Sequence, residues 1–218
     1  HEAFHKPAPR AHEQHQQQGD VQRGKDEVFH GVRFRPKGSG QSDSPWGNLR
    51  NTLESDTNMP LAIRRAENHE LEAVHGLIVE LAAYERAKDQ VFLTLDQFAK
   101  DAAEGHFEVT VAATHGGDIV GMALHHPRYS TWEGRTWYLE DLVVTESWRG
   151  RGVGKALFDA VVACANEQQA KRLEWQVLEW NAPAIGFYEK LGARVSADWL
   201  NGRLTREQLT SWTQIPTQ

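Results

Sequence analysis

The clearest periodic pattern in the chain is helical and lies between Glu67 and Arg86. Apolar residues recur there at intervals of three and four, along one face of a helix: Leu71, Val74, Leu77, Ile78 and Leu81. A second helix is predicted to run to about Glu104, because Thr94 stands where an N-terminal cap belongs. Two successive helices are therefore expected early in the folded part of the chain.

Short runs of β-branched or alternating apolar residues predict strands around these helices. Gly116-Gly117 joins two of the strands as a hairpin, since glycine accepts the backbone angles of tight turns. The predicted strands are Leu61–Arg65, Phe107–Thr114, Asp118–His126, Tyr138–Val144, Lys171–Leu178 and Arg194–Leu204.

Three further helices follow the hairpin. They are predicted at Lys155–Gln169, at Ala182–Leu191 with Gly192 as the stop, and from a cap at Thr205 to Trp212. The elements then follow the order β-α-α-β-β-β-α-β-α-β. This order predicts an α/β domain with a central mixed sheet flanked by helices.

A glycine-rich turn, R-G-R-G-V-G at Arg149–Gly154, lies between a predicted strand and a predicted helix. Glycines let backbone N–H groups approach an anion, and the N-terminus of the following helix adds partial positive charge. The Walker pattern fails because Ala156 follows Lys155, and G-x-G-x-G does not match the dinucleotide pattern G-x-G-x-x-G. A phosphorylated cofactor is the expected ligand, and a turn that binds nothing is the alternative.

Residues 1–58 differ in composition from the rest of the chain. They contain five of the eleven histidines and keep no helical or strand period, so disorder is predicted for them. Four of these histidines could bind a transition metal loosely: His1, His5, His12 and His15. A polar tail without a ligand is the favoured interpretation. The folded domain is expected at residues 59–218, with no metal site.

The overall composition argues against several classes of protein. The net charge of -6 disfavours nucleic acid as a partner and favours cationic ones. The single cysteine, Cys164, cannot form an intrachain disulfide, which predicts a reducing, cytoplasmic location and a core thiol. No apolar run approaches the length of a membrane span, so no membrane partner is expected.

Four segments carry a resemblance that covers nearly all of residues 59–218. They are L-I-V-E-L-A-A-Y-E-R-A-K-D-Q-V-F-L-T (Leu77–Thr94), Y-S-T-W-E-G-R-T-W-Y-L-E-D (Tyr129–Asp141), R-G-R-G-V-G (Arg149–Gly154) and E-W-N-A-P-A-I-G-F-Y-E-K-L-G-A (Glu179–Ala193). The chain resembles the GNAT superfamily of N-acetyltransferases, and within it the diamine (spermidine/spermine) acetyltransferase family. The resemblance implies the GNAT fold, acetyl-CoA as co-substrate, a small cationic amine as acceptor, and a homodimer.

The resemblance also implies roles for individual residues. Glu140 would take a proton from the amine, directly or through a water, and Tyr188 would protonate the CoA thiolate. A solvated carboxylate and a core aromatic are the plain structural alternatives for these two. The residues expected to bind acetyl-CoA are Leu142, Val143, Val144, Arg149, Gly150, Arg151, Gly152, Val153, Gly154, Asn181 and Tyr188.

Carboxylates and aromatic rings at or beside the family's substrate positions suit a cation: Tyr84, Glu85, Glu140, Asp141, Glu174, Trp175 and Gln176. Strand alternation predicts that Glu140 and Asp141 point to opposite faces. Two departures weaken a long polyamine as substrate. Ser130 stands where the mammalian polyamine enzymes carry an acidic residue, and the acidic stretch before the last strand is shorter, with Asp198 as its main carboxylate. Thialysine or another lysine-like amino acid fits at least as well.

Two other functions stay open as hypotheses. A protein N-acetyltransferase of the same fold would need an open peptide groove, and the turn near Trp132–Trp137 looks too occupied for one. A non-catalytic sensor of acetyl-CoA or polyamine is disfavoured because Glu140 and Tyr188 are both present.

Overall fold

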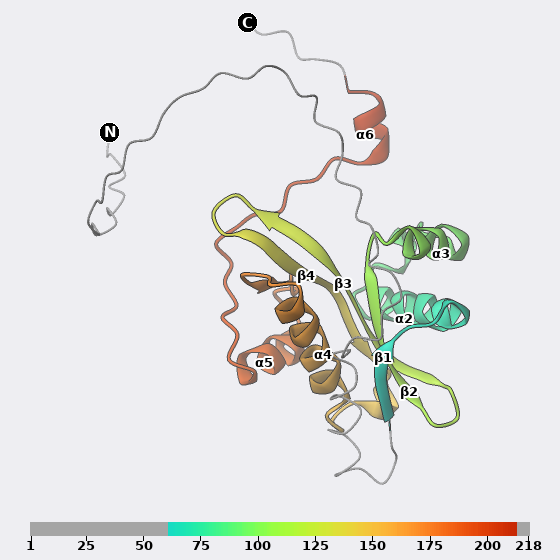
Figure 1. Cartoon of the computed structure of the whole chain (residues 1–218). Helices are drawn as coiled ribbons and strands as arrows, with labels where there is room; N and C mark the ends of the chain where they lie inside the picture. The colour runs from blue at the N-terminus through green and yellow to red at the C-terminus, as the bar shows by residue number, and fades with distance from the viewer. Residues whose placement is uncertain (1–60, 213–218) are drawn as a thin grey trace, which may run out of the picture. The chain divides into compact units, whose positions relative to one another are not determined.

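The computed structural model describes residues 61–212, whose framework is a five-stranded mixed sheet (Figure 1). The strands lie side by side in sequence order: β1 (Leu61–Arg65), β2 (Glu108–Thr114), β3 (Ile119–Ser130), β4 (Gly134–Val144) and β5 (Leu173–Glu174). Neighbours from β1 to β4 are antiparallel, and β5 runs parallel to β4. The predicted mixed sheet is confirmed.

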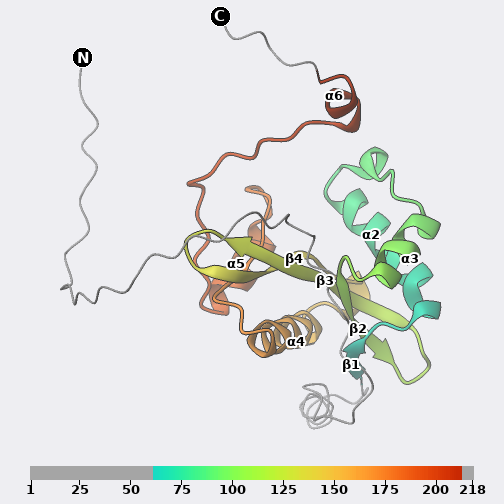
Figure 2. The same ribbon diagram turned by 45° about the horizontal axis from the view of Figure 1, so that its top comes forward.

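Helices cover both faces of this sheet (Figures 1 and 2). α2 (Leu71–Tyr84) and α3 (Leu95–Glu104) pack on one face, and α4 (Val153–Glu167) and α5 (Ala182–Lys190) pack on the other. The remaining described helical segments are short: η1 (Asn68–Glu70), η2 (Lys88–Gln90), η3 (Glu146–Trp148) and α6 (Arg206–Thr210). Within residues 61–212, none of the helices has the length and hydropathy that crossing a membrane requires.

Side-chain caps determine where several helices begin. The Oγ1 atom of Thr94 accepts a hydrogen bond from the backbone amide of Gln97 and starts α3, as predicted. Asn181 and Thr205 cap α5 and α6 in the same way. These polar residues accept from amides that have no partner within the helix, so the sequence fixes the helix starts locally.

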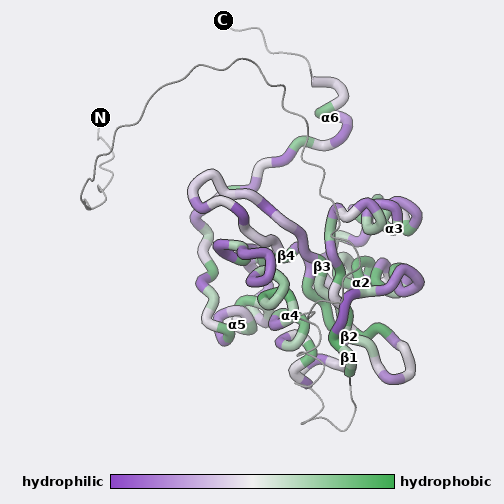
Figure 3. Tube along the Cα trace, viewed as in Figure 1, coloured by the Kyte–Doolittle hydropathy of each residue, from purple (hydrophilic) through white to green (hydrophobic). Residues whose placement is uncertain are grey.

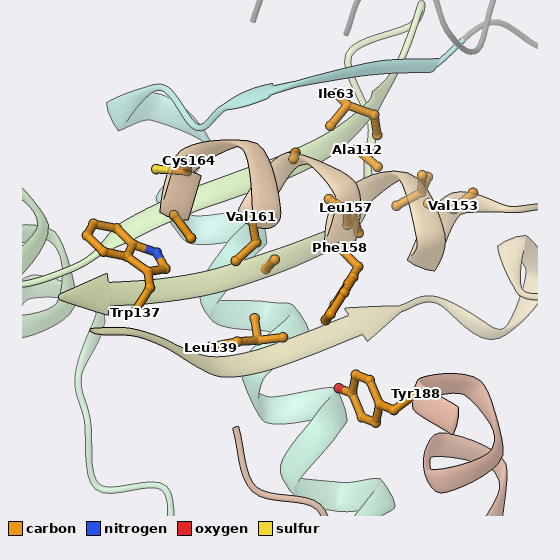
Figure 4. Close-up of a cluster of buried hydrophobic side chains, with 14 residues drawn as sticks. Ile63, Ala112, Trp137, Leu139, Val153, Leu157, Phe158, Val161, Cys164 and Tyr188 are labelled. Atoms are coloured by element: carbon orange, nitrogen blue, oxygen red, sulfur yellow. The ribbon is translucent and has the colours of Figure 1, made fainter. Parts of the chain in front are cut away.

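Two hydrophobic clusters, one on each face, hold the layers together. On the α4 face, the fully buried Leu157 and Val161 pack with Leu139 of β4 (Figure 4). On the other face, Val74 of α2 and Phe98 of α3 are fully buried with the opposite side chains of the strands. Figure 3 shows apolar segments along α4 and the central strands. The apolar faces predicted from periodicity thus form the core.

Two predicted strands differ from the structure. Only Leu173–Glu174 of the predicted Lys171–Leu178 strand pairs with β4, and Arg194–Leu204 forms no strand at all. The latter segment is largely exposed and contains Asp198, Asn201 and Gly202, which have low strand propensity. The prediction of disorder for residues 1–58, with its histidines, lies outside the described residues.

A buried polar chain crosses β2, β3 and β4. His125 has no exposed surface; Trp137 Nε1 donates to its Nδ1 at 3.0 Å, and its Nε2 lies 3.0 Å from Oγ1 of Thr110. Because an indole N–H can only donate, Nδ1 is unprotonated and Nε2 carries the hydrogen. Burial is the main cause that lowers the pKa of His125 from 6.5 to about 4, with smaller effects from Arg65 and His126.

This buried histidine predicts acid sensitivity of the fold. The unfolded chain takes up a proton at this site below pH 6.5, whereas the folded chain does so only near pH 4. The stability that neutral His125 contributes is therefore complete above pH 6.5, and about 3 kcal/mol is lost as the pH falls to 4. Urea unfolding across this range measures the loss.

The matched variants for this experiment are His125→Asn and His115→Asn. The first keeps an acceptor for the Trp137 indole but removes the titrating group, so we expect lower stability at neutral pH with a shallower slope between pH 6.5 and 4. The second changes an exposed turn residue and should keep the wild-type slope. If the stability of His125→Asn falls with pH as steeply as that of the wild type, His125 is not the group that causes the acid sensitivity.

Candidate active site

The sheet opens between β4 and β5. The two strands pair at two positions only, ending at Tyr138 and Glu174, so within the described residues β4 has no strand on this edge over residues 139–144. Tyr188 of α5 lies on this side of the sheet, its ring extending toward the strand that carries Leu139 (Figure 4). Leu142, Val143 and Val144, which are expected to bind acetyl-CoA, lie along this open edge.

β4 carries a bulge at Glu140. Leu124 of β3 pairs with Asp141, but the next residue, His125, pairs with Leu139, so Glu140 is an additional residue in β4. The bulge interrupts the strict alternation on which the prediction of opposite faces for Glu140 and Asp141 rests. The two carboxylates lie close enough for the charge of one to raise the pKa of the other.

Three carboxylates gather at this bulge: Glu85 at the end of α2, Glu140 and Asp141. Burial raises the pKa of Asp141 to about 6, and the charges of Glu140 and Glu85 contribute to the increase. Burial also raises the pKa of Glu85. The negative charges of Glu140 and Glu85 disfavour the ionised form of Asp141, so a cation placed beside Asp141 relieves this repulsion.

Tyr188 is the buried hydroxyl group of the site. Its side chain is only 7% exposed, and its ring packs against Trp175 at 4.7 Å and against Phe187 at 5.1 Å between centroids. Burial, together with the charge of Asp141, raises the pKa of Tyr188 to about 12. The hydroxyl therefore stays protonated near neutral pH, and it lies close enough to Asp141 to be affected by its charge.

The glycine-rich turn leads directly into α4. Gly150 and Gly152 have φ angles of +72° and +82°, which favour glycine, and Gly152 is the N-cap of α4 without a side-chain capping bond. The first-turn amides of α4 thus have no side-chain cap, and Arg151 lies exposed beside them. Such backbone amides at a helix N-terminus are the groups with which the phosphorylated cofactor expected from the sequence would interact.

Contacts between side chains link this turn to α2 and α5. Arg149 donates from Nε to the carbonyl oxygen of Val144 at 2.9 Å and stacks over the ring of Tyr84. The hydroxyl of Tyr84 donates to Oδ1 of Asn181 at 3.2 Å. Tyr84 therefore connects the predicted cofactor residues Arg149 and Asn181 and lies beside Glu85.

The remaining predicted substrate residues are less available. Glu174 forms an ion pair with Arg172 at 3.1 Å, and Gln176 donates to Asn201 at 2.6 Å. Trp175 is half-buried against Tyr188, so it supports the site as packing.

The structure adds a residue that the sequence patterns did not reveal. His126 lies 3.5 Å from Glu140, a contact that depends on strand register and on the bulge. A different group of potential metal ligands, Asp101, Glu104 and His106, lies at the exposed end of α3 with ligand atoms within 4.8 Å of one another. That group is unconnected to the site, and exposed acidic side chains of this kind are common without an ion.

Comparison with known proteins identifies the family. The model of the Acetyltransferase (GNAT) family matches residues 67–193. The chain belongs to this family. The matched region contains the open strand edge, the bulge, the glycine-rich turn and Tyr188, so the GNAT domain and the candidate site coincide.

Curated relatives of this GNAT domain act on amines. Thialysine N-epsilon-acetyltransferase of Bos taurus is 34% identical over 141 residues, which cover 61% of this chain and 83% of the relative. The protein of the same name in Mus musculus is 31% identical over 159 residues, covering 67% and 94%. Spermidine/spermine N(1)-acetyltransferase-like protein 1 of Homo sapiens is 30% identical over 158 residues, covering 67% of this chain and 23% of the relative.

Solved structures share the fold. Aminoglycoside N-acetyltransferase AAC(6')-Iy in complex with CoA superimposes with a TM-score of 0.57 at 21% identity, covering 68% of this chain and 97% of the other. Aminoglycoside acetyltransferase meta-AAC0020 gives a TM-score of 0.58 at 23% identity, covering 66% and 95%. Family and relatives together show that the protein is an acetyl-CoA-dependent N-acetyltransferase.

Proposed function

We propose that this GNAT enzyme transfers an acetyl group from acetyl-CoA directly to a primary amine of a small cationic molecule. The observation that supports the proposal best is the group of three carboxylates, Glu85, Glu140 and Asp141, at the bulge where β4 leaves β5. These carboxylates would bind a cation. The hydroxyl of Tyr188 is near enough to Asp141 for that charge, together with burial, to raise its pKa.

The amine must lose a proton before it can attack the thioester. An alkylammonium has a pKa of about 10, so near neutral pH it arrives charged and without a lone pair. Asp141 and Glu85 hold the ammonium by charge, and Glu140, which is 55% exposed, takes the proton directly or through a water. The same carboxylates thus bind the substrate ammonium and accept its proton.

The second proton leaves the nitrogen when the tetrahedral intermediate collapses. The hydroxyl of Tyr188 donates a hydrogen bond to the departing sulfur. Because burial raises the pKa of Tyr188 to about 12, far above the value of about 8.5 for a thiol, it cannot remain a tyrosinate after giving up its proton. We therefore propose that Tyr188 passes on the proton that the nitrogen releases, and ends the step protonated.

The glycine-rich turn fits the pyrophosphate of acetyl-CoA. Gly152 has a φ angle of +82°, where a residue with a side chain is strained. Gly154 has no such φ angle, and a methyl group at that position would lie 3.7 Å from the Phe187 ring, an ordinary contact. Gly152→Ala should raise the KM for acetyl-CoA about tenfold by displacing the turn. Gly117→Ala, at a glycine with φ +91° in the turn between β2 and β3, is the matched control and should change this KM less than about twofold. Equal effects of the two substitutions would contradict this account of the turn.

A short amine suits the site better than a long polyamine. The anionic charge is concentrated at the bulge, and Glu174, which stands further along the sheet edge, is neutralised by Arg172. The relatives named for thialysine are consistent with an acceptor of lysine-like length. We propose a thialysine- or lysine-like amino acid as the substrate class, with a diamine as the alternative.

Direct transfer is tested by mass spectrometry of the protein after incubation with acetyl-CoA alone. We expect no acetyl-enzyme, and CoA release only after the amine is added. A stoichiometric acetyl-enzyme that transfers its acetyl group to the amine would contradict direct transfer.

A further inference from the structure

His126 of β3 lies against the proposed base. Its Nε2 is 3.5 Å from Oε2 of Glu140, and its ring packs on Tyr138, with centroids 5.4 Å apart. Strand register sets His126 opposite Tyr138, immediately beside the bulge. The His126 side chain is 30% exposed, so the imidazole is in contact with both the carboxylate and water.

The second ring nitrogen limits what Nε2 can do. Nδ1 lies 3.1 Å from the carbonyl oxygen of Pro127, which can only accept, so Nδ1 carries a hydrogen. Nε2 then offers a lone pair in the neutral ring and an N–H in the imidazolium. A hydrogen bond between Nε2 and Glu140 therefore requires one proton between them. Either the imidazolium donates to the carboxylate, or the carboxylic acid of Glu140 donates to the lone pair of the neutral ring.

The reaction itself requires an exit for a proton. An ammonium loses two protons on becoming an amide, and the CoA thiolate takes up one of them. The other must reach solvent in every turnover. Glu140, whose side chain is 55% exposed, would have to release it before the next amine can be deprotonated.

We propose that His126 is a relay residue that carries this proton from Glu140 to solvent; the inference rests on the proposed function. The ammonium gives a proton to the Glu140 carboxylate, the resulting carboxylic acid gives it to Nε2 of neutral His126, and the imidazolium gives it to water. Each step restores the preceding group, so no charge accumulates over a turnover.

The surroundings of His126 are polar enough for such a role. Glu140 faces Nε2, and the Arg128 guanidinium lies over the neighbouring Tyr138 ring at 5.1 Å. The charges of Glu174 and Asp141 are also near enough to affect Tyr138. Glu140 is the carboxylate in direct contact with His126, which makes it the proton donor in the relay.

The test compares His126→Ala, His126→Phe and the exposed-turn control His115→Ala. The readout is acetylated amine, measured from about pH 6 to about pH 9 with and without added imidazole. We expect His126→Ala to lower kcat about tenfold at pH 7, with recovery as the pH rises and on addition of imidazole, which can occupy the vacated space. In His126→Phe the new aromatic ring fills that space, so this variant should lose activity similarly and gain nothing from imidazole.

The outcomes separate the relay from the proposed function. If the wild-type enzyme acetylates an amine and His126→Ala is fully active, or is impaired equally at all pH values and without rescue, the relay is wrong and the function stands. If the wild-type enzyme acetylates no small amine, the function and the relay fail together. Should His126→Ala fail to fold, as judged by its unfolding transition, the pH profile of His126→Phe decides, since its ring preserves the packing on Tyr138.

Discussion

Replacing Tyr188 with Phe is expected to lower kcat by about tenfold to a hundredfold while leaving acetyl-CoA binding almost unchanged. The substitution removes one hydroxyl and keeps the ring that packs on Trp175 and Phe187, so the core around α5 is preserved. Without the hydroxyl, the departing sulfur loses its hydrogen-bond donor and the nitrogen loses its proton carrier. Steady-state kinetics with saturating amine measures kcat, and calorimetry measures acetyl-CoA affinity.

The control for this variant is Tyr129→Phe, the same chemical change at a side chain that is 72% exposed on β3. It should keep wild-type kinetics. A Tyr188→Phe enzyme with wild-type kcat would remove Tyr188 from the mechanism and leave it as a core aromatic.

Replacing Asp141 with Asn is expected to reduce kcat/KM for the amine about a hundredfold at pH 7.5. Asp141 supplies the most buried negative charge of the three carboxylates, and loss of one partner leaves the substrate cation poorly neutralised. The KM for acetyl-CoA should stay within about twofold. Asp159→Asn, which removes a carboxylate paired with Lys155 on α4, is the matched control and should be silent.

The pH profile gives a second readout for Asp141. Since burial and neighbouring charges raise its pKa to about 6, the carboxylate is ionised above pH 6 and neutral below it. The wild-type kcat/KM for the amine should therefore fall as the pH drops through 6, and Asp141→Asn should lack this fall. If kcat/KM of Asp141→Asn still falls as the pH drops through 6, a group other than Asp141 controls this fall.

Much of the fold follows from local sequence patterns. Helix faces, the Thr94 cap and the glycine hairpin depend on neighbouring residues, and the structure confirms them. The Arg194–Leu204 strand was wrongly predicted because strand formation requires a partner, which a single segment cannot reveal. The length of β5 was overestimated because it also depends on a partner: β5 pairs with β4 at two positions only.

The site could be predicted only in part. Glu140, Tyr188 and the glycine-rich turn stand in recognisable segments, but the environment of each depends on contacts between distant parts of the chain. The bulge in β4 interrupts the simple alternation of a strand at Glu140 and Asp141, and the charge of Glu140 contributes to the raised pKa of Asp141. His126 was missed because its contact with Glu140 exists only through the register of β3 on β4.

The most direct test of the central claim is CoA release from acetyl-CoA across a panel of acceptors: thialysine, lysine, putrescine, spermidine, spermine, an aminoglycoside and a short peptide. The account predicts strong turnover of one short cationic amine, thialysine or lysine before spermine, with a product heavier by a single acetyl group. Preferential acetylation of the peptide, or bound acetyl-CoA with no turnover of any small amine, would contradict it.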